Sequence, residues 1–368
     1  MNPLPGVAGG ETTLLRLLPR LGERGWRVSM TVPAGGRLRA AAETIGLDVR
    51  LLPLGPPERR TGASYAGAAL APVVLAGADS VLLNGLSTQR VVPALTLLRR
   101  PALLLVNNPL PEPPAAWGRR GFWRRVRAIA APSDHAASEC RAAGAPAELV
   151  HTAYPAAWEG AEPPGAAAPP PAGQRVAFVG QLEPHKGVLE LLAAARRFLA
   201  ERPRATLTIL GEAPDHRETY ATRLREAAGH PDLNGRVRFA GFVADAGRAM
   251  TGFDLVVVPS LAEPFGAVAA EAAAAGRPVV ATAVGGMREV VIDGETGLQV
   301  PAGDPAALAE AIGALLDDPA RMHALGVRAL ELAGRFAPEA YARRIDELLP
   351  RGGGPRGALG PVEPRGTH

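Results

Sequence analysis

The chain has 368 residues, of which 47% are hydrophobic, 21% charged and 4% aromatic, and its formal net charge at pH 7 is +4. A chain of this length exceeds what one hydrophobic core usually organises, so we expect two domains. No uncharged apolar run reaches the roughly 20 residues of a membrane-spanning helix, and the single cysteine, Cys140, excludes an intrachain disulfide and a zinc site built from several cysteines.

Charge and the first residues bear on partners and location. The sequence pI of about 9.8 is the one feature that favours nucleic-acid binding. The basic residues are almost all arginine, spread among nearly as many acidic ones, and few aromatic side chains are present to stack on bases. We therefore expect phosphate ligands or an anionic membrane surface, and no nucleic acid. Because no secretory signal begins at Met1, we expect a cytoplasmic protein, or one peripheral at the inner face of the membrane.

The first part of the chain alternates helical stretches with short apolar runs, which is typical of parallel βα units. It opens on a glycine loop, MNPLPGVAGG, of a kind that usually follows the first strand of a doubly wound domain. No apolar run precedes this loop, so we expect the first strand to be missing, and we favour a start downstream of the true one over an incomplete sheet. The expected strands are residues 28–32, 49–54, 80–83, 102–106 and 128–131.

Residues 117–129, WGRRGFWRRVRAI, are basic and aromatic at helical spacing, which predicts an amphipathic helix. One interpretation is a surface helix whose apolar side packs on the first-domain sheet while its arginines are solvated. The other is a patch that contacts anionic lipid, with Trp117 or Trp123 at the interface. The apolar face would hold Phe122, Val126 and Ile129, and the basic face Arg120, Arg124 and Arg127.

A proline-rich stretch, EGAEPPGAAAPPPAGQ, disfavours both helix and strand and indicates an interdomain linker. The βα alternation restarts after it, and the pattern is helical from Pro305 to about Leu349. Further strands are expected at 176–179, 207–210, 237–239, 255–258 and 279–281. The predicted organisation is a first domain over 1–158, the linker over 159–174, a second domain over 175–335, a helix over 336–350 that crosses back to the first domain, and a disordered tail over 351–368.

The turn from Gly180 to Gly187 joins the strand RVAFV to a helix that begins near Val188. Backbone amides at a helix start, the helix dipole and the ammonium of Lys186 together suit an anion such as a diphosphate. Taken alone, an ordinary turn with Lys186 in solvent is the simpler interpretation.

Two carboxylates, Glu263 and Glu271, stand eight positions apart across a junction from loop to helix. The run FDLVVV before them predicts a buried strand, and the alanine-rich run 266–275 predicts a helix. Eight helical residues at about 100° each return to within about 80° of the starting direction, so both carboxylates are expected to face one crevice at the carboxyl end of the sheet. The spacing alone is weak evidence, since both side chains could be solvated. The turn around Lys186 favours a shared site.

Four segments together resemble the retaining glycosyltransferases of family 4, also called glycosyl transferases group 1, which have the GT-B architecture. They are FVGQLEPHKG, SLAEPFGAVAAEAAAAGRPVVAT, GGMREVVIDGETGLQVPAGDPAALAEAI and the first-half glycine loop at Gly9-Gly10-Glu11. The resemblance implies an α/β fold of two doubly wound, Rossmann-like domains that face a central cleft. It also implies a hexosyltransferase-like enzyme of carbohydrate or cell-envelope biosynthesis.

The resemblance implies a role for each matching position. Glu271 would accept hydrogen bonds from the ribose hydroxyls, Glu263 would lie against the hydroxyls of the donor sugar, and Lys186 would neutralise the leaving diphosphate. Glu263 and Lys186 are thus the expected catalytic residues. The other expected donor contacts are the amides of Phe265 and Gly266, Gly9 and Gly10 from the opposite domain, Gln181, and Phe242 and Val243 near the base.

The implied reaction transfers a sugar from a UDP-, GDP- or ADP-sugar to a hydroxyl of a glycan, lipid or small molecule, with retention of configuration. The leaving phosphate itself would accept the proton of the nucleophile. We expect no metal and no cofactor, because the sequence has no Asp-x-Asp element and its seven histidines lack ligand spacing.

Two departures from the family pattern motivate an alternative. Gln181 stands where the family usually has an arginine, and Asn107-Asn108 where many members have a histidine that contacts the donor sugar. Amides keep hydrogen bonds but carry no charge and cannot act as acid or base at neutral pH. With the missing strand, they leave open a non-catalytic or weakly active protein that binds sugar nucleotides. Asn107 and Asn108 are the expected sugar contacts in either case.

Overall fold

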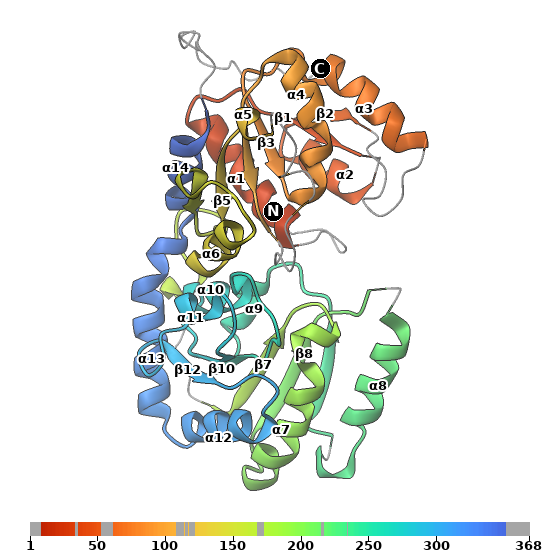
Figure 1. Ribbon diagram of the computed structural model, residues 1–368. Coiled ribbons are helices and arrows are strands. Elements are labelled where there is room, and N and C mark those ends of the chain that lie inside the picture. Colours follow the sequence, from red (N-terminus) through yellow and green to blue (C-terminus); the bar gives the residue numbers. More distant parts are fainter. Residues whose placement is uncertain are drawn as a thin grey trace, which may run out of the picture.

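The computed structural model contains two α/β domains, one above the other, with the chain returning to the first domain at its end (Figure 1). The strands within each sheet are parallel. The structure describes residues 9–33, 36–52, 62–107, 122–167, 173–214, 217–233 and 235–350, together with Pro114 and Trp117.

The N-terminal domain alternates helices with strands. Its elements are α1 (Gly9–Glu23), β1 (Ser29–Val32), α2 (Arg37–Thr44), β2 (Asp48–Leu51), α3 (Gly62–Leu75), β3 (Val81–Asn84), η1 (Leu86–Val91), α4 (Val92–Leu98), β4 (Ala102–Leu105), α5 (Phe122–Arg125), β5 (Val126–Ala131), α6 (Asp134–Ala142), η2 (Ala147–Leu149) and β6 (Val150–Thr152). The strands form a sheet of two, β1-β2, and a sheet of four, β3-β4-β5-β6. Helix α1 joins both, because its leucines share one apolar cluster with Met30 of β1 and Leu103 of β4.

The two N-terminal sheets bear on the prediction of a missing first strand. Within the described residues, β1 pairs only with β2 and β3 pairs only with β4. The residues before Gly9, on which the prediction falls, lie outside the described part of the chain. The absence of a first strand therefore stays a prediction.

The C-terminal domain has one sheet of six strands in the order β12-β11-β10-β7-β8-β9. Its elements are β7 (Arg175–Val179), η4 (Pro184–Lys186), α7 (Val188–Glu201), β8 (Thr206–Leu210), α8 (Glu218–Ala228), η6 (Pro231–Leu233), β9 (Val237–Gly241), α9 (Ala246–Met250), β10 (Leu255–Val258), α10 (Ala267–Ala274), β11 (Val279–Thr282), α11 (Met287–Val290), β12 (Gly297–Val300), α12 (Pro305–Leu316), α13 (Pro319–Leu332) and η7 (Ala333–Phe336). The short η3 (Pro164–Ala167) precedes them. Strands β7 and β10 are central neighbours, which decides where the site forms.

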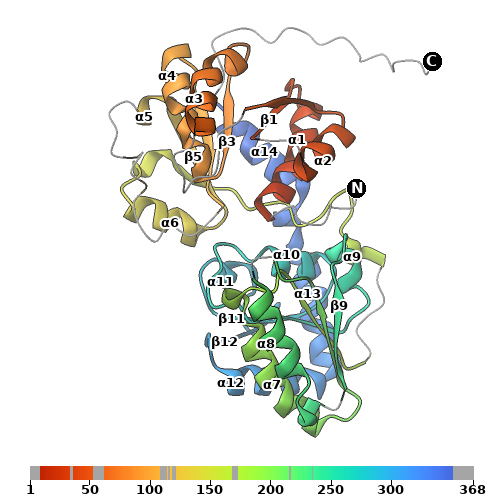
Figure 2. The same ribbon diagram turned by 90° about the vertical axis from the view of Figure 1, so that its right-hand side faces the viewer.

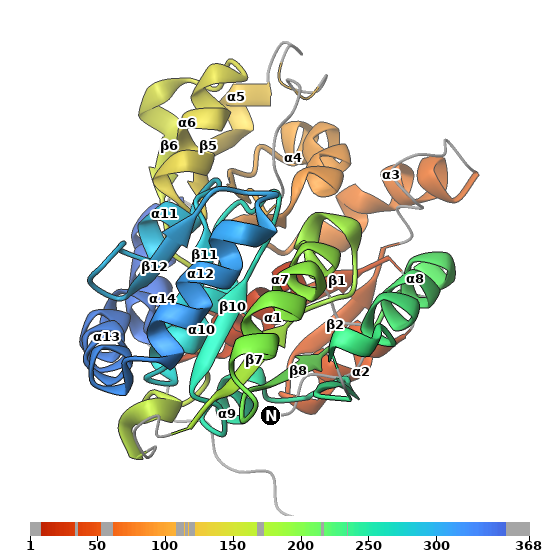
Figure 3. The ribbon, with the colours of Figure 1, turned by 90° about the horizontal axis from the view of Figure 1, so that it is seen from below.

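Helices cover both faces of this sheet. Residues of α7, α8 and α12 pack in one apolar cluster, and residues of α9, α10 and α11 pack in another. Seen from below, α7 and α12 lie over the strands on the near side (Figure 3). Strand β10, with the sequence LVVV, is buried along its whole length, as expected for a strand covered on both faces.

Helix α14 (Pro338–Leu348) carries the chain back to the N-terminal domain, where it lies beside α1 (Figure 2). Tyr341 and Ile345 are buried in the same apolar cluster as the leucines of α1. The Trp26 indole also donates a hydrogen bond of 2.8 Å to Oδ1 of Asp346. The C-terminal helix, which follows the C-terminal domain in the chain, thus packs on the N-terminal domain.

The predicted strands are largely confirmed. Each apolar run that was expected to be a strand contains one, but β6 and β12 were not predicted. Both are edge strands, and their sequences, VHT and GLQV, mix polar with apolar residues. Short edge strands need less apolar sequence, because only part of their surface is buried.

The amphipathic helix predicted over 117–129 is wrong. Among the described residues of this segment, Phe122–Arg125 is the helical part, and strand β5 begins at Val126. The apolar residues of the predicted face are buried, and Ile129 pairs with Leu104 of β4, so strand pairing of β-branched residues overrides the helical pattern. Arg124 and Arg127 are exposed, and Arg120 lies outside the described residues. The finding favours the packed interpretation, since the patch proposed to contact lipid lacks its apolar face. None of the described helices is long and apolar enough to cross a membrane.

Candidate functional site

Two loops meet at the carboxyl edge of the C-terminal sheet, where β7 and β10 are neighbours. The chain continues from β7 to β8 on one side and from β10 to β11 on the other. Open α/β sheets bind ligands at such a switch point, and this edge with its two loops is called the crevice below. The Leu261 amide donates to the His185 carbonyl at 2.7 Å, so the loops touch. Gly187 has a φ of +70°, and a Cβ on it would lie 1.9 Å from the carbonyl oxygen of Pro259. Only glycine fits at this approach.

Lys186 and Glu263 form an ion pair at this edge. Nζ of Lys186 is 2.7 Å from Oε2 of Glu263, and 25% and 13% of the two side chains are exposed. Lys186 ends η4, and Gly187 is the N-cap of α7, so no cap side chain covers the amides of the first turn of α7. Lys186 is also the only lysine in the sequence, which otherwise uses arginine for its permanently charged basic residues. An ammonium, a helix start and a carboxylate thus share one crevice.

The backbone around Glu263 is held by the connection between β11 and α11. The Gly286 amide donates to the Glu263 carbonyl at 3.1 Å. A Cβ on Gly285 would lie 2.0 Å from that carbonyl oxygen, and a Cβ on Gly286 would lie 2.4 Å from the carbonyl oxygen of Pro264. Glycine is required where these backbones approach, and the approach fixes the loop that carries the Glu263 carboxylate.

The start of α10 places two further predicted residues. Gly266 is its N-cap, with a φ of +104°, and a Cβ there would lie 3.0 Å from Sδ of Met287. The Phe265 ring is buried beside Tyr154 and Phe336, with centroids 6.1 and 5.5 Å away. The Phe265 side chain therefore belongs to the core, and only its backbone is suited to a ligand.

Glu271 on α10 is paired across the boundary between the domains. Its Oε1 accepts a hydrogen bond of 3.0 Å from Nη1 of Arg16 on α1. Burial raises the pKa of the Glu271 carboxyl, and the Arg16 charge opposes this rise. Because α10 begins at Ala267, the residues from Glu263 to Gly266 are not helical, and the angle predicted between the two carboxylates does not apply. Each carboxylate instead has a cation of its own.

Gln181, Phe242 and Val243 lie at the carboxyl ends of β7 and β9. Phe242 is 37% exposed, and its amide donates to Oε1 of Glu212 at 3.3 Å. Val243 is half-buried, and Gln181 is exposed. The residues expected near the nucleotide base thus follow strands on the same edge of the sheet as Lys186.

In the N-terminal domain, the structure brings together Gly10 and Asn107. A Cβ on Gly10 would lie 2.9 Å from Nδ2 of Asn107. Asn107 follows β4 and donates from the same Nδ2 to Oδ1 of Asn84, at the end of β3, at 2.7 Å. Gly9 begins α1, whereas Asn108 lies outside the described residues. Helix α1 thus packs closely on the Asn107 side chain at Gly10, while a ligand role for either residue stays a prediction.

A contact that sequence reasoning missed joins α6 to the loop of Glu263. Oγ of Ser133 donates to the Pro264 carbonyl at 2.6 Å. The amides of Asp134 and His135, at the start of α6, donate to the two carboxylate oxygens of Glu289, each at 2.8 Å. A carboxylate at a helix start is stabilised by these amides and by the helix dipole. The N-terminal domain therefore contacts both the loop that follows Glu263, at Pro264, and helix α11, at Glu289.

The local sequence indicates the start of α6, but it does not indicate that α6 contacts Pro264 and Glu289. A serine before a helical run indicates an N-cap, and Ser133 does accept a bond from the Ala136 amide at 2.9 Å. Tyr154 also donates from its hydroxyl to Oε2 of Glu289 at 3.0 Å, and burial followed by this bond raises the pKa of Tyr154. Arg16 carries no motif. These partners are more than a hundred positions apart, and no local pattern connects them.

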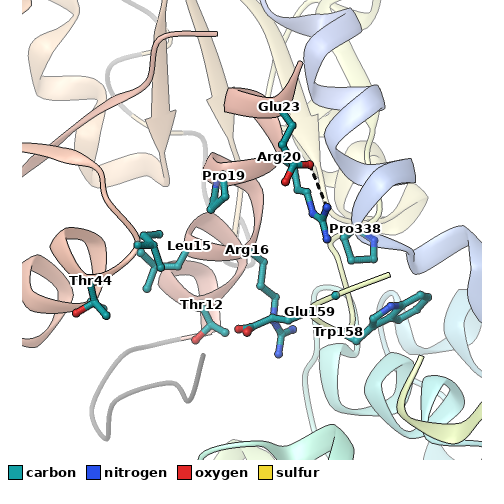
Figure 4. Close-up of a pocket in the computed structure, with 13 residues that line it drawn as sticks. Thr12, Leu15, Arg16, Pro19, Arg20, Glu23, Thr44, Trp158, Glu159 and Pro338 are labelled. Atoms are coloured by element: carbon teal, nitrogen blue, oxygen red, sulfur yellow. Dashed lines mark hydrogen bonds and ion pairs between the residues drawn. The ribbon is translucent and has the colours of Figure 1, made fainter. Parts of the chain in front are cut away.

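A pocket of about 310 Å³ lies beside Arg16, between α1, α2 and residues 158–160 (Figure 4). Arg20 on its wall lies 3.0 Å from a carboxylate oxygen of Glu23 and 3.0 Å from one of Glu339. Neither Lys186 nor Glu263 lines the pocket. The pocket therefore does not include the Lys186 and Glu263 pair, and its acidic and basic side chains largely neutralise one another.

Comparison with known proteins identifies the C-terminal domain. Residues 173–318 match the sequence model of a family described as Glycosyl transferases group 1. Glycogen synthase of Mycobacterium tuberculosis is 40% identical over 153 residues, which are 39% of this chain and 34% of that protein. D-inositol 3-phosphate glycosyltransferase of Kineococcus radiotolerans is 39% identical over 202 residues, which are 51% and 46% of the two chains. The chain thus spans less than half the length of these curated relatives.

Solved structures extend the likeness to nearly the whole fold. HepE of Anabaena, in complex with UDP and glucose, has a TM-score of 0.78 at 25% identity over 94% of this chain and 96% of its own. Sucrose-phosphate synthase of Thermosynechococcus elongatus has a TM-score of 0.73 at 24% identity over 93% and 92%. The predicted architecture of two Rossmann-like domains is confirmed.

Proposed function

Because residues 173–318 match the model of the glycosyl transferases group 1 family, we propose that this chain transfers a sugar from a nucleoside diphosphate sugar to an acceptor hydroxyl. The acceptor belongs to a glycan, a lipid or a small molecule. HepE was solved with UDP-glucose, which makes a UDP-sugar the first donor to test, ahead of GDP- and ADP-sugars.

The observation that carries this proposal is the contact between Lys186 and Glu263 at the switch point of the sheet. An ammonium at a helix start suits the diphosphate, and a carboxylate next to it suits the hydroxyls of the attached sugar. The distance of 2.7 Å between Nζ and Oε2 supports the proposal, because a sugar and its phosphate are neighbouring groups of the donor. Because Lys186 has three N–H donors, it can keep Glu263 as a partner while it binds the phosphate.

The remaining contacts are those that the family resemblance implies for each residue, and we propose them on that ground. Glu271 accepts hydrogen bonds from the ribose diol, and Phe242 and Val243 lie against the base. The amides of Phe265 and Gly266, at the start of α10, face the sugar or the phosphate. Gly9, Gly10 and the asparagines approach from the opposite domain when the domains close.

The proposed chemistry retains the configuration of the anomeric carbon. The bond from this carbon to the diphosphate oxygen breaks, and the acceptor oxygen forms its bond on the same face. The proton of the acceptor hydroxyl moves to the departing phosphate oxygen, so Glu263 does not become a nucleophile. Glu263 and Lys186 then act by binding and by charge.

We propose that the charge on the leaving diphosphate is met by Lys186 and the amides at the start of α7, without a metal ion. Donors of this kind typically contribute a few kcal/mol each when they are fixed in a dry site. In the described part of the chain, no group of three or more His, Cys, Asp or Glu side chains is placed to hold a metal ion, but the proposal rests on Lys186. Release of nucleoside diphosphate should be unchanged by EDTA. Loss of release that Mg²⁺ or Mn²⁺ restores would contradict metal independence.

The test is a donor panel read by nucleotide release. UDP-, GDP- and ADP-sugars are incubated with the purified chain, and the nucleoside diphosphate formed is measured over time. One donor should be consumed, and Glu263→Gln should lower the rate by about 100-fold or more, as for other groups that bind the transition state. Glu310→Gln, on the exposed side of α12, is the matched control and should leave the rate unchanged.

The alternative is a protein that binds sugar nucleotides without turnover. Gln181 supports it, because this exposed side chain supplies no charge to the diphosphate. Tight donor binding without release, across all donors and with hydroxyl acceptors present, would favour this alternative. In that case Gln181→Arg should tighten binding, and restored release would identify the missing charge as the cause.

A further inference from the structure

We propose that Arg16 of α1 is a positioning residue of the donor site, which acts from the N-terminal domain by holding Glu271 ready to accept the ribose diol. This inference rests on the proposed function and adds a residue that neither the sequence motifs nor the family match contains. Arg16 stands 255 positions before Glu271, on the other domain.

The geometry connects three parts of the molecule through one guanidinium. Nη1 of Arg16 donates to Oε1 of Glu271 at 3.0 Å and to the carbonyl of Ala156 at 3.0 Å. The two charged side chains are 14% and 13% exposed, so the pair is mostly removed from water. Helix α1, helix α10 and the segment that follows β6 therefore meet at Arg16.

The arrangement leaves capacity for a ligand. A carboxylate has two oxygens with about four acceptor directions, and Arg16 occupies one direction of Oε1. The other oxygen of Glu271 and its second direction on Oε1 suit the two hydroxyls of a vicinal diol. Because the guanidinium fixes the side-chain rotamer, less conformational entropy is lost when the diol binds.

The charge on Arg16 is needed because the surroundings of Glu271 oppose ionisation. Burial raises the pKa of the Glu271 carboxyl, and the nearby Asp245 and Glu159 carboxylates raise it further. Arg16 is the group that lowers it, through its charge and its hydrogen bond. Only the ionised carboxylate offers acceptors alone to a diol. Loss of the Arg16 charge should therefore favour the protonated form and weaken ribose binding at neutral pH, with recovery as the pH rises.

Arg16 also connects ribose binding to the position of the N-terminal domain. Six residues earlier on the same helix, Gly10 packs against Asn107. Six helical residues span about 9 Å, so α1 is a short rigid link between the ribose carboxylate and the asparagine at the end of β4. A donor that engages Glu271 would thereby favour the arrangement in which α1 faces the cleft.

The test compares ribose and deoxyribose forms of one nucleotide. Binding of UDP and of 2′-deoxy-UDP is measured by calorimetry between pH 6 and pH 9 for the parent chain, Arg16→Gln, Arg16→Lys and Glu271→Gln. GDP or ADP replaces UDP if the donor panel selects that base. Arg20→Gln is the control, since Arg20 lies one turn further along α1 and pairs with Glu23 and Glu339.

Arg16→Gln should weaken UDP binding by about tenfold or more at pH 7, the size typical of hydrogen bonds to charged groups. The loss should shrink as the pH rises, and it should be small for 2′-deoxy-UDP and in the Glu271→Gln background. Arg16→Lys, which keeps the charge, should retain more affinity than Arg16→Gln, and Arg20→Gln should match the parent chain.

Three results would overturn the inference. One is an equal loss for UDP and 2′-deoxy-UDP, another is full affinity in Arg16→Gln, and the third is a change in thermal stability without any change in binding, as expected of a purely structural bridge. Failure of the parent chain to bind any nucleoside diphosphate would overturn the proposed function as well, so the two failures are distinguishable. Arg16→Lys keeps the test decisive if Arg16→Gln does not fold.

Discussion

The two domains contribute to the site in different ways (Figure 1). On the C-terminal side, one six-stranded sheet sends successive loops to its carboxyl edge, and Lys186 and Glu263 follow two neighbouring strands. On the N-terminal side, the described strands fall into two sheets, and the contacts with the site come from the helices α1 and α6. Arg16 and Ser133 supply them.

The two halves of the site differ in the contacts that fix the positions of their residues. The C-terminal half is fixed by backbones in direct contact, with glycine at the points where Gly187 meets Pro259 and Gly285 meets Glu263. The N-terminal half reaches the site through the side chains of Arg16 and Ser133 and through two backbone amides at the start of α6, so its geometry depends on how the domains are placed. We therefore expect substitutions in the C-terminal half to damage the site itself, and substitutions in the N-terminal half to change domain placement.

The largest effect is expected for Gly285→Ala. The new Cβ would lie 2.0 Å from the Glu263 carbonyl oxygen at a φ of +49°, so the loop must move. The control is Gly294→Ala, because Gly294 has a φ of +72° but open space around it. Backbone strain alone should cost about 1–2 kcal/mol in the control, whereas Gly285→Ala should cost more and abolish turnover. Urea unfolding measures the free energy of unfolding, and nucleotide release measures turnover. An equal loss of stability in the two variants would contradict the view that backbone contacts fix the C-terminal half of the site.

Lys186→Arg is expected to lower turnover by about 100-fold, although the charge is kept. A guanidinium is longer and planar, and it cannot take the place of an ammonium 2.7 Å from Glu263 without moving the phosphate. Arg196→Lys, in an exposed pair with Asp232 at 2.7 Å, is the reverse control and should have no effect. Turnover of Lys186→Arg within a few-fold of the parent chain would show that this position needs charge alone.

Glu289→Ala is expected to lower turnover by about tenfold while nucleotide affinity changes little. The carboxylate accepts the amides of Asp134 and His135 from the other domain, and bonds of this kind contribute about 1–3 kcal/mol. The control is Glu295→Ala, which breaks an exposed pair with Arg328. Turnover, nucleotide binding and small-angle scattering separate the effects. A loss confined to affinity, with unchanged scattering, would mean that this contact does not set domain placement.

The smallest effect is expected for His151 on β6. Burial, followed by the charges of Arg344 and Arg141, lowers the pKa of this imidazole in the folded chain. The unfolded chain then binds the proton more readily, so stability is complete above about pH 6.5 and falls as the pH drops below that value. His151→Gln should flatten this part of the stability profile, measured by thermal unfolding between pH 5 and pH 8. An unchanged slope would assign the acid sensitivity to other groups.

Sequence patterns predicted the strands, turns and helices that carry Lys186, Glu263 and Glu271, while the roles of these residues stay predictions. Buried strands such as β10, the turn at Lys186 and the helix after Gly266 all have local signatures. The N-terminal half was predicted less well, since the segment 117–129 has helical spacing but completes a sheet as β5. Arg16 and Glu289 could not be found, because their partners lie on the other domain and an isolated charged residue has no pattern.

The isolation of Lys186 among arginines has a practical consequence for labelling chemistry. Acylating reagents that attack unprotonated amines react with lysine and with the chain terminus, while guanidinium groups resist them. With one lysine in the chain, a quarter of it exposed and its Nζ beside Glu263, a single internal acyl group would report on the crevice alone. Mass spectrometry of the labelled chain would then count occupied crevices directly, one molecule at a time.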